Sequence, residues 1–124
     1  MSETSRGVIL LASDLMLTSS VSSLAASAGI GFRSTDSIEA VLQFMAEVPD
    51  AALLVDLGCP GLQLSDIAGK LDSRVLSKAV AYGPHVHAAK LQAARDAGFG
   101  TVLSRGQLTA QLPTLISRAA AEEA

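Results

Sequence analysis

The hydrophobic positions of this chain form short apolar runs of strand length, separated by longer segments with helical spacing. The runs cover residues 8–12, 30–34, 51–56, 79–82 and 101–103. The run at 51–56 is apolar without interruption until its last residue, Asp56. A strand that is buried on both faces has such a continuous run, which is typical of a parallel sheet. The pattern therefore predicts five strands in a parallel arrangement.

The first two segments between these runs place their apolar residues on one helical face. A spacing of three and four residues predicts two amphipathic helices. Gly29 is expected to end the first of them, because glycine is common just after the last helical residue. Asp36 and Glu39 have the spacing of a capping box before the second helix. The apolar positions are Leu17, Val21, Leu24, Ala25 and Ala28 in the first helix, and Ile38, Val41, Leu42 and Met45 in the second.

Three more helices are predicted in the second half of the chain. Residues 64–71 form a short one, and residues 84–97 form a longer one that begins at Pro84 and stops at Gly98. Proline favours the first helical position, because its missing N–H would have no partner there. Pro113 is therefore expected in the first turn of the last helix, since a proline further inside costs about 3 kcal/mol. The apolar positions of that last helix are Leu112, Leu115, Ile116, Ala119 and Ala120.

Five strands alternating with five helices predict an α/β fold, a doubly wound parallel sheet with helices on both faces. Right-handed crossovers favour the flavodoxin-like strand order 2-1-3-4-5 at this length. The sequence contains no linker and no repeat, so residues 1–124 are expected to form one domain with its core in residues 5–121. From the initial Met and the polar tail, a complete small protein is expected.

Composition narrows the classes of function. Hydrophobic residues make up 49% of the chain and charged residues 17%, with a net charge of −3. Such a balance gives no general attraction to nucleic acid. No apolar run approaches the roughly 18 residues of a membrane helix, so a cytoplasmic protein is expected. The single cysteine, Cys59, excludes an internal disulfide.

Asp56 is the strongest candidate for a functional residue. It ends the third apolar run and is followed at once by the turn Gly58-Cys59-Pro60-Gly61. Ligands and chemistry gather beyond the carboxyl ends of the strands in open parallel α/β sheets.

Two stretches of the chain resemble the receiver domain of two-component response regulators. One is Val55-Asp56 with Pro60 four residues later, and the other is residues 93–105, with the sequence AARDAGFGTVLSR. The resemblance extends over nearly the whole chain in element order and spacing. It implies that Asp56 is in the place of the phosphoacceptor aspartate.

The phosphorylation pocket that the resemblance implies is degenerate. Ala12 and Ser13 occupy the places of the two adjacent acids that hold a divalent metal in the family, and Asp14 comes one residue later. Mg²⁺ needs oxygen ligands in near-octahedral geometry, for which Asp14 and Asp56 are the remaining carboxylates. The resemblance therefore implies no resident metal or other cofactor. Asp56 is expected to be held by Arg105 or by a backbone amide.

Three further positions differ from the family pattern. Gly83 is in the place of the serine or threonine that contacts the phosphoryl group. Arg105 is in the place of the family's lysine after the fifth strand. Gly106 is in the place of the proline that follows that lysine. Arginine keeps the positive charge but not the compact geometry of lysine. Val102 is in the place of the aromatic switch residue, and it has no ring to rotate.

A metal site at His85, His87 and Cys59 is another interpretation of the sequence. The histidines are two residues apart at a predicted helix start, where positions i and i+2 do not face each other. They are therefore expected to be partly exposed loop residues. Cys59 has no neighbouring cation in the sequence that would lower its pKa, so it is expected to be a small loop residue.

These features together predict a stand-alone pseudo-receiver that is not an enzyme and that signals by binding a protein. The resemblance implies a histidine kinase, an output protein or a second copy of the chain as partner. It also implies a partner face on the fourth helix, fifth strand and last helix, where Leu91, Leu108 and Leu112 are the expected contact residues. One alternative is a working response regulator that is phosphorylated on Asp56. Another is a small-molecule sensor that uses the crevice at the carboxyl edge of the sheet.

Overall fold

A computed structural model describes residues 6–121 of the chain. Five parallel strands form one sheet in the order β2-β1-β3-β4-β5. The strands are β1 (Gly7–Leu11), β2 (Gly31–Thr35), β3 (Ala52–Asp56), β4 (Val80–Gly83) and β5 (Thr101–Ser104). This is the flavodoxin-like order, so the predicted fold class and strand order are confirmed.

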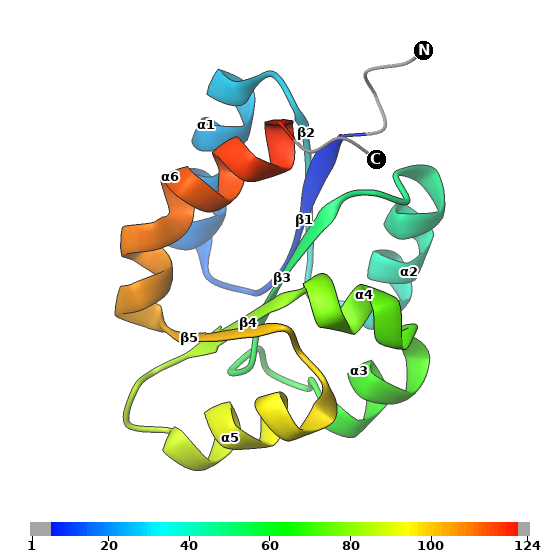
Figure 1. The fold of residues 1–124 in the computed structure, drawn as a ribbon, viewed down its shortest axis with the longest axis vertical. Coiled ribbons are helices and arrows are strands. Elements are labelled where there is room, and N and C mark those ends of the chain that lie inside the picture. The colour runs from blue at the N-terminus through cyan, green and yellow to red at the C-terminus, as the bar shows by residue number, and fades with distance from the viewer. Residues whose placement is uncertain (1–5, 122–124) are drawn as a thin grey trace.

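Six helices connect or follow the strands in the described part of the chain. They are α1 (Leu15–Ala28), α2 (Ile38–Glu47), α3 (Leu64–Lys70), α4 (Ser73–Lys78), α5 (Ala88–Ala97) and α6 (Arg105–Ala121). Figure 1 shows α1 and α6 together on one face of the sheet, while the other helices cover the opposite face. No helix within residues 6–121 has the length and apolar character that crossing a membrane would require.

The alternation of side chains along each strand divides the interior into two cores. In β1, Val8 and Leu10 face the layer of α1 and α6, whereas Ile9 and Leu11 face the layer of α2 to α5. All four are buried, as expected of a strand that is covered on both faces. The central strands are therefore almost wholly apolar until they end at the carboxyl edge of the sheet.

Two helix ends agree with the glycine signals in the sequence. Gly29 follows α1 with φ 76°, and Gly98 follows α5 with φ 111°. Both values lie in the left-handed region, which glycine enters without the steric cost of a Cβ atom. The left-handed conformation of each glycine ends its helix and so determines where the next strand can begin.

The start of α2 corrects the predicted capping box. Ser37, not Asp36, precedes the helix, and its hydroxyl accepts a hydrogen bond from the Ala40 amide at 3.3 Å. Its own amide donates to the Thr35 hydroxyl at 3.0 Å. Leu42, which was predicted to be buried, lies at the exposed edge of the helix. Phe44 packs against the core instead.

The helix α4 is absent from the sequence-based prediction. It is six residues long and begins after Asp72, whose carboxylate accepts a hydrogen bond from the Arg74 amide at 2.8 Å. Leu76 is its one buried residue. A single buried residue in six gives no periodicity, so the segment could not be distinguished from a loop.

The helix predicted to begin at Pro84 and the helix predicted to hold Pro113 in its first turn both begin elsewhere. Pro84 lies in a turn, where its carbonyl accepts a hydrogen bond from the His87 amide at 2.9 Å, and α5 starts at Ala88. Pro113 lies well inside α6, which starts at Arg105. Proline has no N–H, so the carbonyl four residues before it in the helix has no amide partner. The ring of Pro113 is exposed, and this carbonyl is therefore on the solvent side of the helix. Buried residues on both sides of Pro113 hold the helix together: Leu108, Leu112 and Ile116.

Candidate functional site

Asp56 is at the carboxyl end of β3, next to β1 and β4 in the middle of the sheet. Only 8% of its surface is exposed. Its Oδ1 accepts a hydrogen bond from the Gly58 amide at 2.8 Å, and the Cys59 amide donates to its backbone carbonyl at 3.1 Å. The turn after β3 thus holds this carboxylate through a backbone amide, which is one of the two arrangements expected from the sequence.

Asp14 uses both of its carboxylate oxygens in structural contacts. Oδ1 accepts hydrogen bonds from the amides of Met16 at 3.0 Å and Leu17 at 3.3 Å, so Asp14 caps α1. Oδ2 forms an ion pair with the guanidinium of Arg105. An N-cap contributes about 1 kcal/mol, and a partly exposed ion pair adds about 0–1 kcal/mol. Asp14 therefore joins the starts of α1 and α6.

Arg105 is positioned by a capping box at the start of α6. The Ser104 hydroxyl accepts from the Gln107 amide at 3.2 Å, and the Gln107 side chain accepts from the Ser104 amide at 2.8 Å. Two amides at the helix start are satisfied reciprocally in this way. The helix begins directly after β5, and its first residue pairs with Asp14 rather than with Asp56.

The two positions between β1 and Asp14 contribute no carboxylate. Ala12 is buried in the core beside α1, and Ser13 is exposed. Within residues 6–121, no three side chains of His, Cys, Asp or Glu come close enough together to hold a metal ion. Any cation at this edge would therefore depend on Asp56 and on an Asp14 that is already engaged.

The remaining positions that the resemblance assigns to a phosphorylation pocket are apolar or lack a side chain. Gly83 ends β4 and is buried, yet a Cβ added there would meet Leu57 and Leu91 only at 3.8 Å. A side chain with a hydroxyl could start from this position without a clash, but the sequence provides none. Val102 is half-buried on the face of the sheet that α5 covers.

Tyr82 is a residue of this region that the sequence analysis did not single out. It pairs in register with Asp56 and is fully buried. Its hydroxyl has no hydrogen-bond partner among the described residues. Burial raises the pKa of Tyr82, and the nearby groups of Asp56 and Cys59 raise it further. The sequence could have pointed to Tyr82, because it is the one tyrosine of the chain and belongs to the apolar strand that was predicted to lie next to the strand of Asp56.

Cys59 is buried in the turn after β3. Burial raises the pKa of its thiol, the charges of Asp56 and Asp36 add to the increase, and a hydrogen bond with Ser13 opposes it. A thiol with a raised pKa holds little of the reactive thiolate at neutral pH. The interpretation of Cys59 as a packed loop residue agrees with these surroundings.

His85 and His87 are both exposed in the segment between β4 and α5. His87 directly precedes α5, and Cys59 is buried elsewhere, in the turn after β3. Val86, between the two histidines, has 71% of its surface exposed. This segment is thus a surface loop at the carboxyl edge of the sheet.

The three leucines chosen as partner contacts are buried in the structure. Leu108 and Leu112 face the core beneath α6, and Leu91 is covered beneath α5. A partner cannot reach these side chains without unfolding the domain, which corrects their assignment as contact residues. The large apolar side chains that are most exposed are Leu15 at 83% and Met16 at 82%. Both are in the first turn of α1, at the carboxyl edge.

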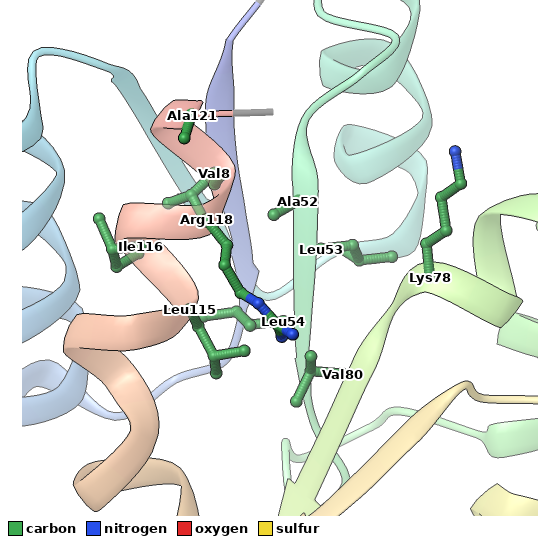
Figure 2. A pocket seen from close by; sticks show the side chains of 11 residues that line it. Val8, Ala52, Leu53, Leu54, Lys78, Val80, Leu115, Ile116, Arg118 and Ala121 are labelled. Atoms are coloured by element: carbon green, nitrogen blue, oxygen red, sulfur yellow. The ribbon is translucent and has the colours of Figure 1, made fainter. Parts of the chain in front are cut away.

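Two cavities open at the opposite edge, near the amino ends of the strands. One lies between α6 and the starts of β1, β3 and β4 (Figure 2), and the other lies between β1, β2 and the end of α2. Neither includes Asp56 among its lining residues. The crevice that the sensor alternative places at the carboxyl edge coincides with neither of them.

Comparison with known proteins bears on the fold. No family model and no curated protein matches the chain. A solved structure that matches is described as a "putative response regulator from Chloroflexus aurantiacus J-10-fl"; the TM-score is 0.71 and the sequences are 17% identical. The match covers 94% of this chain and 98% of the other. The chain thus has the flavodoxin-like fold of a response-regulator receiver.

Proposed function

We propose that this chain is a receiver-type signalling domain that acts by binding a protein partner, without efficient Mg²⁺-dependent phosphorylation of Asp56 and without enzymatic turnover. The observation that carries the proposal is the double engagement of Asp14. One of its oxygens caps α1 and the other pairs with Arg105. The only carboxylate close in sequence to the end of β1 is therefore not available as a metal ligand.

The chemistry of phosphoryl transfer explains why this engagement matters. Such transfer depends on positioning and on neutralising the charge of the phosphoryl oxygens, with little covalent help from the protein. Mg²⁺ is held by carboxylates and water at about 2.0–2.1 Å in near-octahedral geometry. Asp56 would supply one ligand while one of its oxygens accepts from Gly58. Arg105 would have to leave Asp14 before it could neutralise charge at Asp56.

The exposed apolar residues around Asp56 support the protein-binding part of the proposal. Leu15 and Met16 follow β1 and Val86 follows β4, so they flank the end of β3 on both sides. Buried contact of such side chains stabilises a complex by about 25 cal/mol for each Å² of apolar surface removed from water. The partner is accordingly a protein that presents an apolar patch to the carboxyl edge.

The phosphorylation part is tested by intact-mass spectrometry after incubation with acetyl phosphate and Mg²⁺. We expect no phosphate adduct on the wild-type chain. The double variant Ala12→Asp, Ser13→Asp supplies acids where the receiver pattern has them, and we expect a detectable adduct on it. That adduct should disappear when Asp56→Asn is added. A wild-type adduct that Asp56→Asn abolishes would refute this part and favour a working response regulator.

The partner-binding part is tested by cross-linking in an extract of the source cells. We expect the double variant Leu15→Ser, Met16→Ser to lose a cross-linked protein that the wild type retains, because the apolar contact is removed. Leu42→Ser is the matched control, since Leu42 is also an exposed apolar helix residue but lies on α2. Equal cross-linking of wild type and double variant would exclude the start of α1 as the contact.

A further inference from the structure

The cavity between α6 and the sheet has the size and the lining of a small-molecule site. Its volume is about 510 Å³, within the range of about 300–1,000 Å³ that ligand pockets occupy. Val8, Leu54, Val80, Leu115 and Ile116 form an apolar floor, and all of them belong to or pack against the core beside α6. Figure 2 shows Leu115 and Val80 between α6 and β3, while Ile116 lies on the side of α6 away from that strand.

Within residues 6–121, the charged residues that line this cavity are both cationic. They are Arg118 and Lys78, and no Asp or Glu of that range lines it, although the whole chain has a net charge of −3. Neither cation forms an ion pair with any residue in the range 6–121. In Figure 2, Arg118 extends from α6 toward β3, while the ammonium of Lys78 points away on the other side of that strand. One guanidinium therefore lies over the apolar floor.

We propose that this cavity binds a small aliphatic monocarboxylate, with its carboxylate on Arg118 and its hydrocarbon chain against Leu54, Val80 and Leu115. A guanidinium presents parallel N–H donors that match a carboxylate in bidentate geometry. One guanidinium balances the single charge of a monocarboxylate, whereas a phosphate monoester carries about two negative charges. Removing the hydrocarbon chain from water supplies the remaining affinity.

The second cavity does not offer this combination. There Glu47 lines the site together with Arg33, and the guanidinium of Arg33 is already placed over the Phe44 ring at 5.8 Å. The monocarboxylate site is also independent of the proposed signalling function, because it lies at the edge of the sheet opposite Asp56. Failure of one proposal leaves the other intact.

Titration with decanoate, followed by two-dimensional NMR, tests the site. We expect saturable shifts of the Leu54, Val80 and Leu115 methyl signals, with a Kd of about 10–1,000 µM for a ligand of this size. Arg118→Gln should weaken decanoate binding about tenfold, the effect of losing one charge-assisted contact. Arg95→Gln removes an exposed arginine from α5 and should leave the Kd unchanged. Decanol, which lacks the charge, should bind the wild type about tenfold more weakly than decanoate.

Several results would overturn the proposal. These are the absence of saturable shifts, shifts that map to the carboxyl edge, or a decanoate Kd that Arg118→Gln does not change. Ala119→Leu narrows the cavity from α6 and gives an independent check, since Ala119 lines it and the larger side chain should abolish binding. Sedimentation that shows a dimer which Leu115→Ser dissociates would assign the cavity to a second copy of the chain and likewise overturn the ligand site.

Discussion

The substitution Gly100→Ala is expected to destabilise the fold by about 3 kcal/mol or more, the upper range for overpacking a close contact. A Cβ atom at Gly100 would lie 1.7 Å from the Ser77 carbonyl oxygen and 2.6 Å from its carbon. Both are backbone atoms, so no side-chain rotation can relieve the clash. The Gly100 amide also donates to the Leu76 carbonyl at 3.0 Å, which fixes the close approach of the two segments.

Thermal unfolding measures this effect against a matched control. For a domain of this size, the loss corresponds to a fall in Tm of roughly 10 °C or more. Gly106→Ala is the control, because Gly106 lies in the first turn of α6 and a Cβ there meets nothing within 4 Å. It should raise stability by about 0.5–1 kcal/mol, since alanine is the better helix former. Equal Tm values for Gly100→Ala and wild type would mean that the end of α4 and the start of β5 are further apart than described.

The sheet could be predicted from the sequence because its signals are local. The uninterrupted apolar run of β3 and the glycines Gly29 and Gly98 each determine structure at the position where they stand. Right-handed crossovers then leave few strand orders, of which the flavodoxin-like order is the commonest at this length. A parallel sheet with short connections has few alternatives once its strands are located.

The helix starts were predicted less well than the strands. In α6 and α2, the helix begins after a capping residue that was not predicted. For α6 the sequence pattern places Pro113 in the first turn, whereas Ser104 and Gln107 form a capping box directly after β5. For α2 the hydroxyl of Ser37 was passed over in favour of Asp36. Burial of the apolar face on both sides of Pro113 stabilises the helix by more than the proline destabilises it. This burial depends on packing against the sheet, which the local sequence does not show.

Some features of the candidate site could likewise be predicted from the local sequence, whereas others depend on tertiary contacts. The placement of Asp56 at the end of β3 followed from its apolar run. The pairing of Arg105 with Asp14 could not be derived, because it depends on how the starts of α1 and α6 meet across the sheet edge. The burial of Leu108 also depends on the true start of α6, because this residue lies before the predicted helix. Leu112 belongs to the apolar positions predicted for that helix, so its burial agrees with the periodicity and contradicts only its role as a contact residue.

Tyr82→Phe is expected to stabilise the protein by about 1–3 kcal/mol at neutral pH, the cost of a buried hydroxyl without a partner. Tyr82 is fully buried and its hydroxyl has no partner in the described residues. Phenylalanine keeps the ring of this β4 residue in the core that α1 and α6 cover and removes only the oxygen. Urea unfolding of both proteins at the same pH measures the difference.

The same residue makes stability fall at alkaline pH. Burial raises the pKa of Tyr82 above its ordinary value, so the folded protein keeps the proton when the unfolded chain releases it above about pH 10. Above that pH the unfolded state binds fewer protons, and the free energy of unfolding falls by up to about 1.4 kcal/mol per pH unit. Tyr82→Phe removes this contribution, so its advantage over wild type should widen between about pH 10 and pH 11.

Spectroscopy separates this explanation from other alkaline effects, because Tyr82 is the only tyrosine in the chain. Tyrosinate absorbance should therefore develop together with unfolding, not before it. The raised pKa of Cys59 lowers alkaline stability in both proteins and cancels in the comparison. Tyrosinate absorbance in the folded protein at about pH 10 would contradict the burial of the hydroxyl. A variant less stable than wild type at neutral pH would mean that a bound water satisfies the hydroxyl, since removing the oxygen would then cost a hydrogen bond.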